Sequence, residues 1–97
     1  MVWLALESHP LIVPKKHIAN IFELPDQLTS SVMRITKRIS IATKAALRAD
    51  GITITQTNGA AVGQSVFHYH VHVYPRWYDD RRLATDHAST TNTLAAI

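Results

Sequence analysis

The chain has 97 residues, 46% hydrophobic and 18% charged, which allows one small globular domain and excludes wholesale disorder. It contains no cysteine, which excludes disulfides and thiolate metal sites; no apolar run reaches the roughly 18 to 20 residues of a membrane helix, so we expect a cytoplasmic protein without a membrane partner. Its formal net charge of +3 is scattered along the chain, which mildly favours phosphate-bearing ligands, and no nucleic-acid partner is expected.

The first half of the chain predicts a strand followed by a long helix. Leu11-Ile12-Val13 is typical of a strand, and Pro14 ends it. Pro25-Asp26 suits the start of a helix, with an acid in the first turn. Beyond it, apolar residues recur at spacings of three and four, namely Leu28, Val32, Ile35, Ile39, Ala42 and Ala46. This spacing predicts an amphipathic helix of about six or seven turns, closed by Asp50-Gly51.

The second half predicts two antiparallel strands joined by a loop. Residues 52–57 alternate branched apolar and polar side chains, as a half-buried strand does. Residues 58–63 form the loop, with a glycine at each end of "GAAVG". A second strand is expected from Ser65 to about Tyr74, stopping at Pro75. Residues 84–97 are small and polar without a clear period, which predicts a tail.

Three histidines occupy alternate positions of that second strand: His68, His70 and His72. Side chains of a strand alternate between its faces, so the three should project on one side. The intervening residues, Phe67, Tyr69, Val71 and Val73, should then face the core. A row of imidazoles that repel one another when charged costs stability, so a purely solvated face is a poor explanation for it.

Two kinds of chemistry fit such a row. Two histidines of a strand can bind Zn²⁺ with a third ligand such as His9, but three on one face splay along the strand, and no carboxylate is nearby, so we expect no metal. Alternatively, a neutral imidazole, here that of the central His70, attacks an electrophilic phosphate, and the phosphohistidine is then cleaved by water. The preceding loop offers amides and neutral donors for the phosphate oxygens, and its glycines let the main chain approach closely.

The stretch His68-Tyr69-His70-Val71-His72-Val73-Tyr74, with Gly63-Gln64-Ser65-Val66 before it and Pro75-Arg76 after it, resembles the signature of the histidine triad (HIT) superfamily. The upstream "HPLIVPKKHI" is similar to a second block of that family. The resemblance covers about residues 9–77. It implies an α+β fold, with a HIT-like antiparallel sheet and one long amphipathic helix, paired as a homodimer. Residues 1–83 would form the domain, and residues 84–97 the tail.

The resemblance also implies an activity. Family members are nucleotide hydrolases or nucleotidyl transferases that attack the α-phosphate of nucleoside phosphoramidates or dinucleoside polyphosphates. By position, His70 would be the nucleophile, with a purine nucleotide as substrate and no cofactor. His68 would orient it, His72 would contact phosphate or assist proton transfer, and His9 would add a further histidine.

The loop positions carry the substrate contacts that the resemblance implies. Gly63, Gln64 and Ser65 would bind the phosphate or the leaving-group side, and Asn58 the ribose and phosphate region. Two alternatives stay open beside this activity: a nucleotide-binding module with little turnover, and a metal-dependent hydrolase that uses the histidine row.

The chain departs from the family pattern at its start. Only eight residues precede His9, whereas HIT domains usually carry another strand there, with an Asp or Asn for the ribose. We therefore expect a domain shortened at the N-terminus. Lost contacts to remote parts of the substrate would lower affinity and specificity more than they would change the phosphate chemistry.

Overall fold

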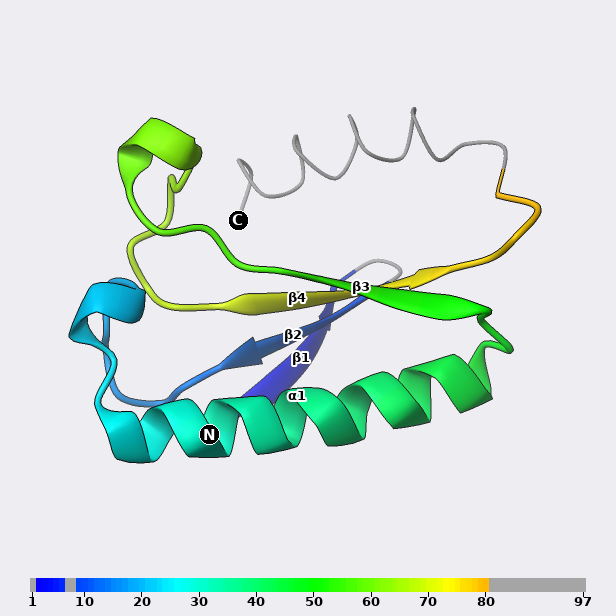
Figure 1. The fold of residues 1–97 in the computed structure, drawn as a ribbon. Coiled ribbons are helices and arrows are strands. Elements are labelled where there is room, and N and C mark those ends of the chain that lie inside the picture. The colour runs from blue at the N-terminus through cyan, green and yellow to red at the C-terminus, as the bar shows by residue number, and fades with distance from the viewer. Residues whose placement is uncertain (1, 7–8, 81–97) are drawn as a thin grey trace.

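The computed structural model describes residues 2–6 and 9–80, and it places a four-stranded sheet against one long helix (Figure 1). The strands are β1 (Val2–Leu6), β2 (His9–Val13), β3 (Gly51–Thr55) and β4 (Val71–Arg76), in the order β1-β2-β4-β3, with every neighbouring pair antiparallel. The helix α1 (Asp26–Ala46) covers one face. Two short 3-10 turns, η1 (Ile21–Glu23) and η2 (Ala60–Val62), complete the described elements. The predicted α+β fold is confirmed, while the homodimer stays a prediction.

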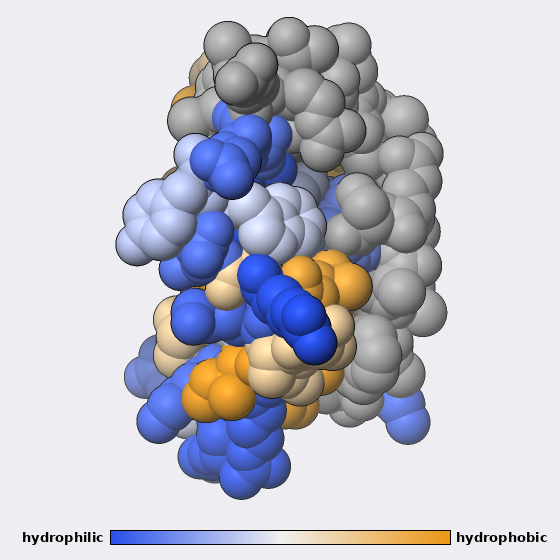
Figure 2. Space-filling model, turned by 90° about the vertical axis from the view of Figure 1, so that its right-hand side faces the viewer, coloured by the Kyte–Doolittle hydropathy of each residue, from blue (hydrophilic) through white to orange (hydrophobic). Residues whose placement is uncertain are grey.

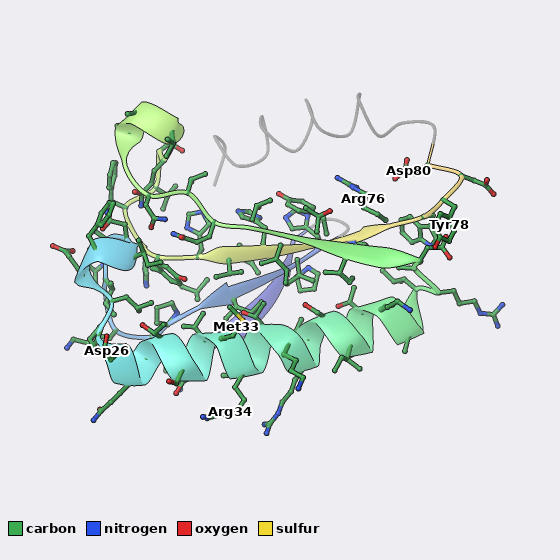
Figure 3. The ribbon with its side chains drawn as sticks, viewed as in Figure 1. Asp26, Met33, Arg34, Arg76, Tyr78 and Asp80 are labelled. Atoms are coloured by element: carbon green, nitrogen blue, oxygen red, sulfur yellow. The ribbon has the colours of Figure 1, made fainter. Side chains whose placement is uncertain are left out.

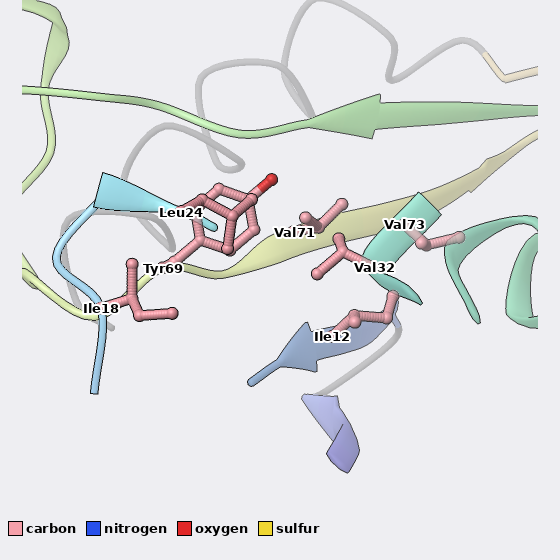
Figure 4. Packing of buried hydrophobic residues seen from close by; sticks show 7 residues of the cluster. All are labelled: Ile12, Ile18, Leu24, Val32, Tyr69, Val71 and Val73. Atoms are coloured by element: carbon pink, nitrogen blue, oxygen red, sulfur yellow. The ribbon is translucent and has the colours of Figure 1, made fainter. Parts of the chain in front are cut away.

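The hydrophobic core lies between the sheet and α1. Its buried members come from β2, from the segment before α1, from α1 itself, and from β4 and the chain leading into it (Figure 4): Ile12, Ile18, Leu24, Val32, Tyr69, Val71 and Val73. Ile12 and Val73 are completely buried. Because Tyr69, Val71 and Val73 alternate with the histidines, their burial under the helix turns His70 and His72 toward the opposite face.

The helix begins where the sequence predicted and ends earlier. Asp26 is its first residue and places an acid in the first turn (Figure 3), where the helix dipole favours a negative charge. Its end is formed by Arg48, which has a left-handed φ of 51°, and by the bond from the Ala49 N–H to the Lys44 carbonyl, 3.0 Å. This is a Schellman ending. The predicted stop at Asp50-Gly51 is therefore wrong, since Gly51 already belongs to β3.

Only part of the predicted apolar stripe of α1 reaches the core. Leu28, Ile35 and Ile39 pack against the core cluster, whereas Ala42 and Ala46 are exposed. Arg34 points away from the sheet (Figure 3). At the end of the molecule where α1 finishes, hydrophilic and hydrophobic residues share the surface (Figure 2). The part of the stripe toward the end of α1 therefore stays outside the core cluster.

The strand that carries the histidines is shorter than predicted. It pairs with β3 as expected, with Thr55 opposite His72 and Ile54 opposite Val73, but it begins at Val71 and not at Ser65. The Tyr69 N–H bonds the Ile18 carbonyl at 2.6 Å instead of a strand neighbour. The chain before Val71 therefore leaves the ladder, and Phe67 is 46% exposed instead of facing the core.

The other end of this strand also differs from the prediction. Pro75 lies inside β4, opposite Ile52 of β3, and the strand ends at Arg76. The pairs with β2 stop at Leu11 opposite His72. Among the described residues, the pairs of β4 beyond His72 are with β3 alone, and a strand accepts proline where no second neighbour needs its N–H.

The N-terminal pairing was not predicted as such. The eight residues before His9 include β1, which pairs along all of β2, from Val2 opposite Val13 to Leu6 opposite His9. No helix in the described residues is long and apolar enough to cross a membrane. The predicted tail at 84–97 lies outside the described residues.

Candidate active site

The third histidine of the row lies in the middle of the sheet. On β4, His72 is flanked by Leu11 of β2 and by Thr55 of β3, and none of its surface is exposed. Its Nδ1 lies 3.0 Å from Nε2 of His9, which begins β2 and is itself buried. The sheet thus joins two imidazoles that are far apart in sequence through a direct hydrogen bond.

The surroundings of His72 keep its ring neutral. The pKa of His72 is lowered from 6.5 to about 3, first by burial and then by the electrostatic effect of positive charge on His70 and His9. Desolvation is the first cause, because a charged imidazolium loses its hydration inside the sheet. At neutral pH His72 therefore carries no charge, and it can donate or accept one hydrogen bond at each nitrogen according to its tautomer.

The central histidine has a defined tautomer. Nδ1 of His70 lies 2.7 Å from the backbone carbonyl oxygen of His68. A carbonyl oxygen only accepts, so Nδ1 must carry the proton, and in the neutral ring Nε2 then bears the lone pair. The His70 ring meets that of His72 edge-on, with centroids 5.1 Å apart. The neutral form of His70 thus presents an unprotonated Nε2 while Nδ1 is held by the main chain.

The first histidine is directed elsewhere. Nε2 of His68 donates to the Pro14 carbonyl at 2.9 Å, and the exposed ring of His17 stands edge-on to it, 5.1 Å away. His68 therefore ties the end of the "HPLIVP" segment to the chain entering β4. Its backbone carbonyl, and not its ring, is what contacts His70.

The loop before the histidines is built around its two glycines. Gly59 and Gly63 flank η2 with φ of 103° and 95°, values that side chains other than glycine adopt at a cost. A Cβ at either position would meet open space, so the backbone conformation is what requires glycine. Gly63 and the following Ser65 are exposed.

Gln64 is buried and holds this loop together. Its Oε1 accepts from the Gly59 N–H at 2.6 Å. Its Nε2 donates to the Ala19 carbonyl at 2.7 Å and to the Val66 carbonyl at 3.1 Å. Both amide protons are therefore used within the protein, and Gln64 positions the loop between the two glycines and the segment before α1.

Asn58 is likewise anchored by protein contacts. It exchanges two side-chain hydrogen bonds with Gln56, of 2.7 and 2.6 Å, and its Oδ1 also accepts from the Ile21 N–H at 2.7 Å. It therefore joins the end of β3 to η1. One proton of its Nδ2 is used by Gln56, and the amide has a second.

Residues 5–78 match the family described as HIT domain. The chain belongs to the HIT family. This confirms the family to which the alternating histidines and their Gly-Gln-Ser-Val prefix pointed.

Relatives and solved structures agree with this membership. An uncharacterized HIT-like protein of Saccharolobus solfataricus is 40% identical over 79 residues, covering 81% of this chain and 57% of that protein. The adenosine 5'-monophosphoramidase of Saccharomyces cerevisiae is 36% identical over 70 residues, covering 72% and 42%. The crystal structure of a Hit-like protein from Bartonella henselae, 31% identical, superposes with a TM-score of 0.72 and covers 92% of this chain and 69% of that one. The chain spans about half the length of these curated relatives.

The candidate site brings some of the predicted residues together more closely than others. His9, His70 and His72 form one buried cluster, whereas His68 faces Pro14. The four predicted loop residues lie on the segment around η2. The side-chain amides of Asn58 and Gln64 are anchored by hydrogen bonds within the protein, whereas Gly63 and Ser65 are exposed. Whether they contact a substrate stays a prediction.

Sequence reasoning missed two residues near the candidate site. Tyr74 has the same parity along the strand as the histidines, which is a signal that could have placed it on their face. Gln56 lies two residues before Asn58 and on the same side of the chain. The sequence alone does not predict the two hydrogen bonds between their side chains.

Metal ligation was one alternative for the histidine row. In the part of the chain that the structure describes, no group of three His, Asp or Glu side chains converges as metal ligands would. The cause is visible in the hydrogen bonds, since His9 and His72 direct nitrogens at each other while His68 directs one at a carbonyl.

Proposed function

We propose that the protein is a nucleotide hydrolase or nucleotidyl transferase that attacks the α-phosphate of nucleoside phosphoramidates or dinucleoside polyphosphates through a phosphohistidine at His70. The observation that carries this proposal is the bond from Nδ1 of His70 to the His68 carbonyl, 2.7 Å. It leaves the lone pair on Nε2, and a neutral imidazole with a free lone pair is the nucleophile that this chemistry needs.

The first step forms a bond between Nε2 of His70 and the α-phosphorus and breaks the bond from phosphorus to the leaving group. For a phosphoramidate the leaving group is an amine, which departs with a proton. His72, neutral and beside His70, contacts the phosphate or assists this proton transfer. Its bond to His9 fixes the ring, so that little reorganisation is required during the reaction.

The second step returns the enzyme to its starting state. Water attacks the phosphorus, the bond to Nε2 breaks, and the nucleoside monophosphate leaves. Gly63 and Ser65 are exposed on the loop beside η2 and supply contacts to the phosphate oxygens. Gln64 acts here by shaping that loop, and Asn58 offers its second amide proton to the ribose and phosphate region.

The substrate class is supported by a relative, since the yeast protein named adenosine 5'-monophosphoramidase aligns over 72% of this chain. We therefore propose a purine nucleotide as substrate, handled by a homodimer in the cytoplasm. A transferase differs from a hydrolase only in the acceptor of the second step, an alcohol or phosphate in place of water.

Turnover of adenosine phosphoramidate tests the assignment of the nucleophile. We expect His70→Ala and His70→Asn to lose roughly 10³-fold or more in rate, because both variants lack the nitrogen that would form the covalent intermediate. His17→Ala is the matched control, since His17 is exposed and lies outside the proposed reaction. Equal rates for the wild type and both His70 variants would refute the proposal.

A binding module with little turnover predicts a different result. Calorimetry with AMP, run beside the kinetic assay, separates the two. Tight binding of AMP by a wild-type protein that releases no amine from the phosphoramidate would favour the binding module.

A further inference from the structure

Tyr74 is the next residue of β4 on the histidine face, and it touches both members of the buried pair. Its ring centroid lies 4.2 Å from that of His9, with the planes tilted by 38°. It lies 5.5 Å from that of His72, with the planes nearly parallel at 3°. Only 5% of Tyr74 is exposed. One aromatic ring therefore contacts two imidazoles that come from different strands.

This contact matters because the bond between the two imidazoles is directional. The ring torsion of a histidine has broad minima, so a hydrogen bond between two such rings needs lateral packing to hold its 3.0 Å geometry. A ring against both imidazoles restricts their rotation. It also occupies space from which water could otherwise compete for His9 Nε2 or His72 Nδ1.

The hydroxyl of Tyr74 contributes less than its ring. Burial raises the pKa of Tyr74 to about 12, so the phenol stays neutral. The Thr55 hydroxyl is near enough to oppose that rise, but within the described residues neither hydroxyl completes a well-formed hydrogen bond. The cation of Arg76 lies over the Tyr74 ring, 5.6 Å from its centroid.

The groups around His72 make it depend on this packing. His9 from β2 and His70, just before β4, both oppose a positive charge on it, and Thr55 faces it from β3 without a charge. Among the described residues, Tyr74 is the other titratable group whose ring contacts that of His72, and it stays neutral. Burial is the largest of these effects, so any change that admits water beside the ring acts directly on its protonation.

We propose that Tyr74 is a positioning residue: its ring fixes the orientation of His9 and His72 and keeps water from the hydrogen bond that joins them. Its consequence for turnover rests on the function proposed above, in which His72 assists at the phosphate. The structural part of the proposal does not, and it is tested without substrate.

The test is an NMR titration of the histidine rings in the full chain, with His72 assigned through the signal lost in His72→Gln. In the wild type we expect His72 to stay predominantly neutral throughout a titration from pH 4 to 8. In Tyr74→Leu we expect its titration to rise by about one pH unit or more toward the ordinary value, because the ring becomes hydrated. Tyr74→Phe, which removes only the hydroxyl, should match the wild type.

Tyr69→Leu is the matched control. Tyr69 is as buried as Tyr74, at 6%, but it belongs to the core under α1, so its loss weakens the fold without exposing the histidine pair. An unchanged His72 titration in Tyr74→Leu would overturn the proposal, as would an equal shift in Tyr69→Leu or in Tyr74→Phe. Should Tyr74→Leu fail to fold, Tyr74→Met keeps a longer apolar side chain and is judged by the same titration.

Kinetics separate this proposal from the function. If Tyr74→Leu shifts the titration while even the wild type turns over no phosphoramidate, the positioning role stands and the proposed activity falls. If the wild type is active, the pH dependence of kcat/KM should shift in Tyr74→Leu and not in Tyr69→Leu. If kcat/KM has the same pH dependence in the wild type, Tyr74→Leu and Tyr69→Leu, Tyr74 has no role in the reaction.

Discussion

Acid is expected to destabilise this protein through His72. In the folded chain the pKa of His72 is lowered from 6.5 to about 3, whereas the unfolded chain titrates near the ordinary value. Between these two values the unfolded state binds more protons, so lowering the pH favours unfolding, and above about pH 6.5 the effect vanishes. His72 is completely buried, so solvent screens little of the effect.

The size of the effect follows from the two pKa values. Each unit of difference corresponds to about 1.4 kcal/mol, so between pH 7 and pH 5 the free energy of unfolding should fall by about 2 kcal/mol through this group. Urea denaturation followed by tryptophan fluorescence at both pH values measures it. His72→Gln, which cannot ionise, should lose about 2 kcal/mol less than the wild type over the same interval.

A second variant controls for the loss of a histidine as such. His17 is exposed, so His17→Gln should follow the wild-type pH dependence. The reasoning fails if the wild type and His72→Gln lose stability in parallel, because burial of His72 would then carry no proton linkage.

Three further changes test the fold at separate points. Ile12→Ala should lower the free energy of unfolding by about 3 kcal/mol, since Ile12 is completely buried; the control Ile41→Ala, at a position 60% exposed, should cost less than about 0.5 kcal/mol. Arg48→Gly should raise it by about 1 kcal/mol, because Arg48 adopts a left-handed φ of 51° that glycine accepts without strain; an unchanged urea midpoint would contradict this. Gln64→Ala should cost about 1 to 2 kcal/mol and speed amide exchange at Gly59, whose N–H bonds the Gln64 side chain; unaltered exchange there would show that the loop holds itself.

Local patterns predicted the parts of the fold that local forces build. The Pro25-Asp26 pair predicted where α1 begins, the apolar period predicted that a long helix follows, and alternation predicted the pairing of β3 with β4. The end of α1 was missed because a nonglycine residue, Arg48, takes the left-handed position. The start of β4 was missed because the Tyr69 N–H bonds Ile18, a partner that only the folded chain brings near.

The site divides in the same way. The alternation of the histidines predicted which face they share, since that depends on the strand alone. Which nitrogen each ring uses could not be predicted, because His72 meets His9 through the order of the strands and His70 meets a carbonyl where the chain leaves the ladder. The chemistry of this site is set by these long-range pairings, and the residue types alone leave it open.

The same pairings bear on metal dependence. Each of four imidazoles directs one nitrogen at a protein atom: His9 and His72 at each other, His68 at the Pro14 carbonyl, and His70 at the His68 carbonyl. A metal bound at the facing nitrogens of His9 and His72 would have to break the hydrogen bond between them. His68 and His70 direct nitrogens at two different carbonyl oxygens, so these nitrogens do not converge on one point.

We therefore expect turnover of the phosphoramidate to persist in excess chelator, with less than about a twofold change in kcat/KM, because metal-free phosphohistidine chemistry needs only the neutral imidazole. Added Zn²⁺ should inhibit, since it competes for the lone pair that His70 presents. Activity that is lost with chelator and restored by Zn²⁺ would instead identify a metal-dependent hydrolase, in which the bond between His9 and His72 opens to bind the ion.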